Sequence, residues 1–255
     1  MEIKVIYETP EVETVDLLVI DAHPDDAEIS AGGAIAKLTA AGKKVAIVDC
    51  TRGEMGTRGN PDLRLQESYE ATKILKVSHR LNLGMMDGFI DESPESLYSV
   101  ISIIRRFKPK IILTHPPFER HPDHEAVHRL VRNALFKSGL TKIHTEINGE
   151  EQEIYRTRKI FCFMQSYQFE RKPDFYIDIS DFQETKMRAI DAFSSQVYVT
   201  GNENTNEPQT KLSSPEFKEE LIARARYFGS LIGVRYAEAY LAIEPVGISC
   251  LSNLI

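Results

Sequence analysis

The chain has 255 residues, with 31 basic and 38 acidic side chains and a formal net charge of −7 at pH 7. This acidic balance excludes a general attraction for nucleic acid or for an anionic membrane surface, so we expect neither as a partner. The apolar fraction of 42% and the length are sufficient for one large folded domain, and no stretch approaches the length of a membrane span.

The N-terminus and the cysteines bear on the cellular compartment. Residues 1–9 mix acidic and basic side chains and lack the apolar segment of a secretory signal. Cys50, Cys162 and Cys250 are odd in number, far apart and in apolar surroundings, which predicts reduced, buried thiols. We therefore expect a cytoplasmic protein.

The first half of the chain alternates apolar runs with helical patterns. The apolar runs predict strands at residues 16–22, 45–50, 80–82 and 110–114. Helix formers and helical spacing predict helices at residues 28–41, 63–75, 97–107 and 122–137. A glycine-rich loop at 51–62 follows the second strand. The repeated β-α-β order predicts an α/β fold with a mostly parallel sheet flanked by helices.

The second half is less regular. We expect a hairpin or loop at 143–154, strands at 159–164, 175–179 and 237–243, and helices at 181–193 and 216–232. A polar loop of fifteen residues is expected at 200–214, and loops of this length are usually functional or mobile. Since no internal repeat is visible, we interpret residues 1–255 as a single domain whose C-terminal half decorates the sheet and the site.

Two short polar clusters each follow a predicted buried strand. The first is H-P-D-D, beginning at His23, and the second is H-P-D-H, beginning at His121. In open α/β sheets, ligands bind outside the carboxyl ends of the strands, so two strands can bring both clusters to one point. Side chains three residues apart can converge on one ion in a first helical turn. The pooled histidines and aspartates are typical of a hydrolytic zinc site.

The two clusters supply both ligands and acid–base groups. A catalytic zinc commonly takes three protein ligands, and we assign His23, Asp26 and His124 to it. Asp25 and His121 are then free beside the ion. Asp25 can take a proton from water as a general base, and a protonated His121 can stabilise an oxyanion or protonate a leaving amine.

Other interpretations of the clusters stay open. Asp123 can orient one of the histidines from behind the ligand set, and either cluster alone can be a helix cap. Two histidines and a carboxylate also form the iron site of some oxygenases, so Fe²⁺ is an alternative to zinc. A sugar- or nucleotide-binding α/β protein without activity is a further alternative, which the free Asp25 and His121 disfavour.

Arginines near the same edge of the sheet are candidates for binding an anionic substrate. Arg58 lies in the loop after the second strand, where a solvated mobile loop is the alternative interpretation. Arg64 is the better candidate because it begins a helix and is better fixed. Arg120 adjoins the second cluster, and its alternative role is a surface salt bridge.

A-H-P-D-D at residues 22–26 and H-P-D-H at 121–124 resemble the motifs of the LmbE-like, or PIG-L-type, zinc deacetylases. The resemblance implies a Rossmann-like fold and hydrolysis of the N-acetyl group from an N-acetylglucosamine unit. It also implies the assignments made above for the zinc ligands, for Asp25 as the base and for His121 as its electrostatic or acid partner.

Further segments resemble the bacillithiol-pathway branch of that family, whose members act on N-acetylglucosaminyl-malate; they lie at 174–180, 195–198, 213–217 and 232–238. The resemblance implies that Tyr198 and Arg64 approach the substrate and that the protein is a homo-oligomer, such as a hexamer. Arg58 or Arg64 would suit the two carboxylates of malate. The loop at 51–59 is richer in Gly and Arg than in that branch, so another N-acetylglucosamine conjugate, such as a chito-oligosaccharide, is the alternative substrate.

Overall fold

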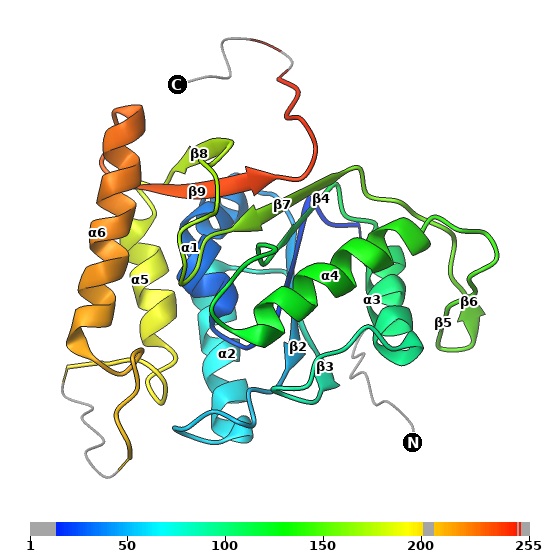
Figure 1. Cartoon of the computed structure of the whole chain (residues 1–255), viewed down its shortest axis with the longest axis horizontal. Helices are drawn as coiled ribbons and strands as arrows, with labels where there is room; N and C mark the ends of the chain where they lie inside the picture. Colours follow the sequence, from blue (N-terminus) through cyan, green and yellow to red (C-terminus); the bar gives the residue numbers. More distant parts are fainter. Residues whose placement is uncertain (1–13, 201–206, 249, 251–255) are drawn as a thin grey trace.

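The computed structural model describes residues 14–200, 207–248 and 250, and Figure 1 shows a central sheet with helices on both faces. The strands are β1 (Leu17–Asp21), β2 (Val45–Thr51), β3 (His79–Met85), β4 (Ile111–Thr114), β5 (Glu146–Ile147), β6 (Glu150–Glu151), β7 (Lys159–Phe163), β8 (Phe175–Asp178) and β9 (Ala237–Ala242). The helices are α1 (Asp26–Ala40), α2 (Pro61–Leu75), α3 (Pro94–Phe107), α4 (Pro122–Lys137), α5 (Gln183–Asp191) and α6 (Pro215–Ile232).

The main sheet has the strand order β3-β2-β1-β4-β7-β9-β8. The strands from β3 to β7 are parallel, and β9 pairs antiparallel with both β7 and β8. This confirms the expected mostly parallel α/β sheet. The chain first builds outward from β1 to β3 and then crosses to β4 on the other side of β1. The carboxyl ends of β1 and β4 therefore flank the topological switch point, where such sheets bind ligands.

Both faces of the sheet are buried, which explains the continuous apolar runs of its strands. Leu18 and Ile20 of β1 pack in one cluster with residues of α3 and α4. Leu17 and Val19 pack in a second cluster on the opposite face, with residues of α1, α2 and α5. The alternation follows from the period of two along a strand. It fixes the position of β1, and hence of the residues that follow it.

Several elements begin earlier or extend further than expected, and local hydrogen bonds explain the difference. The helix α2 begins at Pro61 because the Asn60 side chain accepts hydrogen bonds from the first backbone N–H groups. Ser93 does the same for α3. The expected hairpin is present as β5 and β6, and its turn residues Asn148 and Gly149 both have positive φ, as this two-residue turn requires.

Some expectations fall outside the described residues. Residues 1–13, which include the N-terminal segment expected to lack a secretory signal, are not described, and neither are residues 201–206 of the expected 200–214 loop. Cys50 and Cys162 are free and buried as expected, but Cys250 is exposed, since it lies beyond β9, the last strand of the sheet. Among the described helices, none has the length and apolarity needed to cross a membrane.

Candidate active site

The first cluster occupies a tight turn between β1 and α1. The strand ends at Asp21 and the helix begins at Asp26, so the chain reverses within four residues. Asp25 has a φ of 126°, which is unusual for a residue with a side chain and costs about 1–3 kcal/mol. Its carbonyl accepts a hydrogen bond from the Ile29 N–H at 3.0 Å, and the Asp26 N–H donates to the His23 carbonyl at 3.2 Å. These bonds hold a strained turn at the edge of the sheet.

The second cluster forms the start of α4. His121 is the N-cap, and its Nδ1 accepts a hydrogen bond from the Asp123 N–H at 3.2 Å, while Pro122 occupies the first helical turn. His124 lies in the same turn. The two clusters meet: the His23 ring centroid lies 4.7 Å from that of His121 and 5.4 Å from that of His124. The prediction that the strand ends bring them to one point is confirmed by this geometry.

His23, Asp26 and His124 form a group that can hold a metal ion. One donor atom from each lies within 4.8 Å of the other two, and all three side chains are buried. Asp26 Oδ2 is 3.3 Å from His23 Nδ1 and 3.4 Å from His124 Nε2. Two imidazole nitrogens and one carboxylate oxygen match the donor set of catalytic zinc sites. A second group of the same kind combines His23 with His121 and Asp123.

Carboxylates surround the far side of the His23 ring. Its Nε2 lies 3.0 Å from Asp87 Oδ1 and 3.5 Å from Asp123 Oδ2. Burial opposes the charged ring, but hydrogen bonds with Asp123, Asp26 and Asp87 raise the pKa of His23 well above its usual value. When Nε2 carries the proton, Nδ1 is left to face Asp26 and is available as a metal ligand. Asp123 therefore lies where an orienting residue was expected, and Asp87 is a second such residue that the sequence did not indicate.

His115 is a further buried histidine at the site, which no motif in the sequence indicated. Its Nε2 accepts a hydrogen bond from the Ala22 N–H at 3.1 Å and lies 3.3 Å from Asp26 Oδ2. Its ring stacks on that of His124, with centroids 4.0 Å apart. Burial, and then the charge at His124, lower the pKa of His115 to about 3, so the ring is neutral. The one sequence feature that indicates a place at the site is its position directly after β4, because Ala22 lies in the same position after β1, next to the first cluster.

Asp25 is paired with Arg64. Arg64 Nη2 donates to Asp25 Oδ2 at 2.7 Å, and Nε donates to the Pro24 carbonyl at 3.0 Å. Both side chains are less than a tenth exposed. Burial raises the pKa of Asp25 to about 7, and the Arg64 charge opposes this rise. The carboxyl group therefore titrates near neutrality, as a general base should. Arg64, expected to bind substrate, lines the cavity but directs these donors at the turn that carries Asp25.

His121 is half-buried beside the candidate ligands. Burial, followed by the charges at His23 and His124, lowers the pKa of His121. The neutral ring is therefore favoured at neutral pH. A proton that His121 gives to a leaving group must consequently reach it during the reaction.

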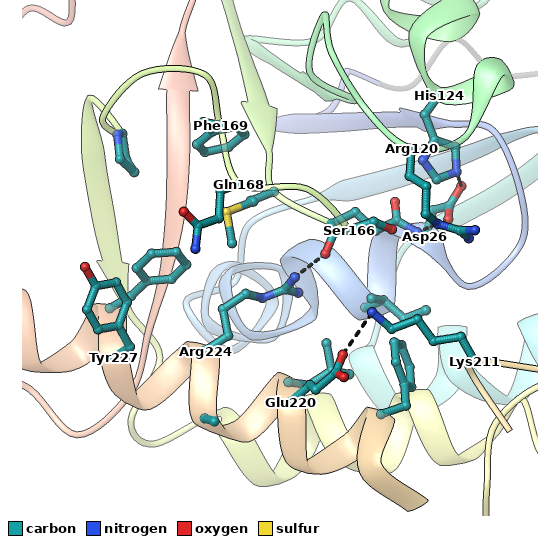
Figure 2. Close-up of a pocket in the computed structure, with 18 of the residues that line it drawn as sticks. Asp26, Arg120, His124, Ser166, Gln168, Phe169, Lys211, Glu220, Arg224 and Tyr227 are labelled. Atoms are coloured by element: carbon teal, nitrogen blue, oxygen red, sulfur yellow. Dashed lines mark hydrogen bonds and ion pairs between the residues drawn. The ribbon is translucent and has the colours of Figure 1, made fainter. Parts of the chain in front are cut away.

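A cavity of about 1070 Å³ opens from the candidate site (Figure 2). One end is lined by His23, Asp25, Asp26 and His124. The lining also includes residues of α6 and of the segment between β7 and β8, and Figure 2 places Phe169 and Tyr227 at the end away from Asp26 and His124. The Phe228 ring lies beside those of Tyr227 and Tyr176, with centroids 5.5 Å and 5.7 Å apart. The volume of the cavity exceeds that of a single sugar ring, so the site can accept a substrate with a sizeable second group.

The other residues that were expected to contact the substrate differ in whether they line this cavity. Arg120 lines it and, among the described residues, forms no side-chain ion pair within 4 Å. Arg58 does not line it: its Nε donates to the Ser195 carbonyl at 3.1 Å and its Nη1 to the Pro208 carbonyl at 3.1 Å. Tyr198 is also outside the described lining, and its backbone N–H donates to the Leu212 carbonyl. The structure thus gathers Arg64 and Arg120 at the site, but not Arg58 or Tyr198.

Comparison with known proteins places these features in a family. The model of the PIG-L family, described as GlcNAc-PI de-N-acetylase, matches residues 18–135, which include both clusters. A diacetylchitobiose deacetylase of Thermococcus kodakarensis is 30% identical over 87% of this chain and 80% of its own.

Solved structures agree with this assignment. A conserved protein from Thermus thermophilus has a TM-score of 0.80 and 34% identity, over 92% of this chain and 97% of its own. The N,N'-diacetylchitobiose deacetylase of Pyrococcus horikoshii has a TM-score of 0.73 and 25% identity, over 94% of this chain and 88% of its own. The chain therefore belongs to the PIG-L family of N-deacetylases, which are amidohydrolases.

Proposed function

We propose that this protein is a zinc-dependent hydrolase that removes the N-acetyl group from an N-acetylglucosamine unit of a conjugate. The observation that carries the proposal is the buried convergence of His23, Asp26 and His124, with the carboxyl group of Asp25 at the same end of the cavity. The family supplies the reaction class. Two histidines and a carboxylate also suit Fe²⁺, so metal content belongs to the test.

Different residues of the chain would carry the separate steps of amide hydrolysis. His23, Asp26 and His124 would hold the ion, which when bound polarises the acetyl carbonyl and acidifies water. Asp25 takes the proton from the attacking water, since its pKa of about 7 lets it both accept and release a proton near neutrality.

The proton must then reach the leaving amine. Asp25 can pass it on directly, or His121 can deliver it after receiving it, because a lowered pKa makes His121 a ready donor once it is protonated. A protonated His121 would also stabilise the negative charge that develops on the acetyl oxygen. Asp87 and Asp123 hold the His23 ring in place from behind.

For the conjugate itself, we propose N-acetylglucosaminyl-malate of bacillithiol biosynthesis as the first candidate. The likeness of the C-terminal segments to that branch supports it. Arg120, which lines the cavity without an ion-pair partner among the described side chains, offers a cation to a malate carboxylate. Arg58 and Arg64 could serve malate only after giving up the hydrogen bonds that they make within the protein. We also expect a cytoplasmic homo-oligomer, such as a hexamer.

A chito-oligosaccharide is the second candidate, and the shape of the cavity favours it. Leu221 and Leu231 both line the cavity and are ten positions apart on helix α6, which corresponds to about 15 Å. The far end carries Phe169 and Tyr227, whose rings suit the apolar face of a sugar. Relatives named as diacetylchitobiose deacetylases support the same substrate.

Release of free amine from three substrates tests the proposal. The zinc-loaded protein is incubated with N-acetylglucosaminyl-malate, N-acetylglucosamine and diacetylchitobiose. Preference for the malate conjugate supports the first candidate, and preference for diacetylchitobiose supports the second. Absence of amine release from all three, by a protein shown to contain stoichiometric metal, would contradict the proposed activity.

A further inference from the structure

Gln165 reaches the candidate metal centre from a strand that neither cluster belongs to. It lies two residues beyond the end of β7, the strand that pairs with β4, so it stands at the same edge of the sheet. Its Nε2 donates a hydrogen bond to Asp26 Oδ1. The other oxygen, Oδ2, is the one that lies near His23 and His124. The two oxygens of Asp26 are therefore divided between Gln165 and the candidate centre.

The backbone on both sides of this side chain is held by two charged side chains. Arg224 of α6 donates through Nη1 to the Gln165 carbonyl, and Figure 2 shows Arg224 directed from α6 toward this segment. Glu119, from the loop before α4, accepts hydrogen bonds from the N–H groups of Ser166 at 2.9 Å and Tyr167 at 3.0 Å. Two elements outside the strand thus hold the backbone from which the Gln165 side chain extends toward Asp26.

Of the two polar atoms of the Gln165 amide, only the nitrogen has a hydrogen-bond partner among the described residues. Its Oε1 is buried and has no hydrogen-bond partner among the described residues. A buried acceptor without a partner costs free energy, so this side chain is not placed for stability alone. Its one side-chain hydrogen bond is directed at a candidate ligand.

We propose that Gln165 is a positioning residue that holds Asp26 with Oδ2 toward the metal ion. This role rests on the proposed function, because it requires Asp26 to be a ligand. The terminal torsion of an aspartate is broad, so a carboxylate without a partner on its outer oxygen can rotate away from the ligand orientation. Hydrogen-bond partners of ligating carboxylates typically contribute a factor of 10–100 to metal affinity. Gln165 supplies such a partner from just beyond the end of β7.

The test is the zinc affinity of Gln165→Met, which preserves length and removes the donor. Affinity is measured by competition with a chromophoric chelator, and the melting temperature of the metal-free protein is measured in parallel. We expect zinc affinity to fall about 10- to 100-fold. The melting temperature of the metal-free form should stay close to that of the wild type, because the hydrogen bond lost on Asp26 is offset by removal of the unpartnered Oε1 of Gln165. Gln165→Ala serves as a second variant if the first does not fold. Gln168→Met makes the same substitution three residues away and should keep wild-type zinc affinity.

Three outcomes would overturn the role of Gln165. Wild-type zinc affinity in both Gln165 variants would show that Asp26 does not depend on the amide. A loss of affinity matched by Gln168→Met, or accompanied by a lower melting temperature of the metal-free form, would indicate a general effect on the scaffold. If the wild-type protein itself bound no zinc, the proposed function would fail first, and the positioning role with it.

Discussion

Replacement of Arg64 by methionine should lower both the stability and the activity of the protein. Methionine fills similar space but leaves Asp25 as a buried carboxyl group without a cation. The 2.7 Å ion pair and the hydrogen bond to the Pro24 carbonyl are both lost. Since the Arg64 charge opposes the burial that raises the pKa of Asp25, its removal moves that pKa further above about 7. Less of the base is then ionised at neutral pH.

The magnitude follows from the burial of the pair. Both side chains are less than a tenth exposed, and removal of one partner of a buried ion pair typically costs about 3–5 kcal/mol. For a domain of this size, each kcal/mol lowers the melting temperature by about 2–4 °C, so we expect a decrease of roughly 6–20 °C. The loss of ionised base should lower kcat/KM by at least about tenfold at pH 7.

Arg52→Met is the matched control. Arg52 pairs with Asp62 at 2.6 Å, but the two side chains are 47% and 84% exposed. An exposed pair contributes about 0–1 kcal/mol to the free energy of unfolding, so this variant should unfold at a temperature close to that of the wild type. Unfolding is followed by calorimetry and activity by amine release. The reasoning would be refuted if Arg64→Met and Arg52→Met unfolded at the same temperature, or if Arg64→Met kept full activity at pH 7.

Three further predictions concern packing, metal and substrate length. Gly33→Ala should lower the free energy of unfolding by about 1–3 kcal/mol in a denaturant titration, because the added Cβ would lie 2.7 Å from the Ile179 side chain. Gly32→Ala should lower it less, since the nearest atom to its Cβ is a lysine methylene at 3.1 Å. Zinc at 100 times its Kd should stabilise the metal-free protein by about 2.7 kcal/mol in thermal melts, and an unchanged melt would contradict a bound ion. Tyr227→Ala should raise KM roughly two- to tenfold for a chito-tetraose but not for N-acetylglucosamine, and an equal effect on both would exclude a distal sugar site.

The sheet and the two clusters could be predicted because they depend on local patterns. An apolar run marks a buried strand, and a polar cluster directly after it must lie at the carboxyl edge. The meeting of His23 with His124 also requires that β1 and β4 be neighbours, which follows from the reversal of strand order in doubly wound sheets rather than from a single β-α-β connection. The ends of helices were less well predicted, since Asn60 and Ser93 begin their helices through caps that overlap with turn signals.

The surroundings of the clusters could not be predicted, because they depend on contacts between distant segments. Asp87 comes from a turn after β3 and His115 from a strand end without a motif, yet both contact the candidate ligands. For Arg64, the sequence indicated a place near the site but not the partner. An arginine at a helix start has no local feature that distinguishes binding to substrate from binding to Asp25, and the tertiary fold decides it.

Amine release by metal-loaded Asp25→Ala, compared with the wild type, tests the central claim most directly. Each protein is loaded with zinc, its metal content is determined, and turnover of the preferred N-acetylglucosamine substrate is measured. The account predicts one bound zinc in both proteins and a rate that falls by about 10²- to 10⁴-fold in the variant. A variant that retained zinc and the full rate of amine release would contradict the proposed deacetylase site.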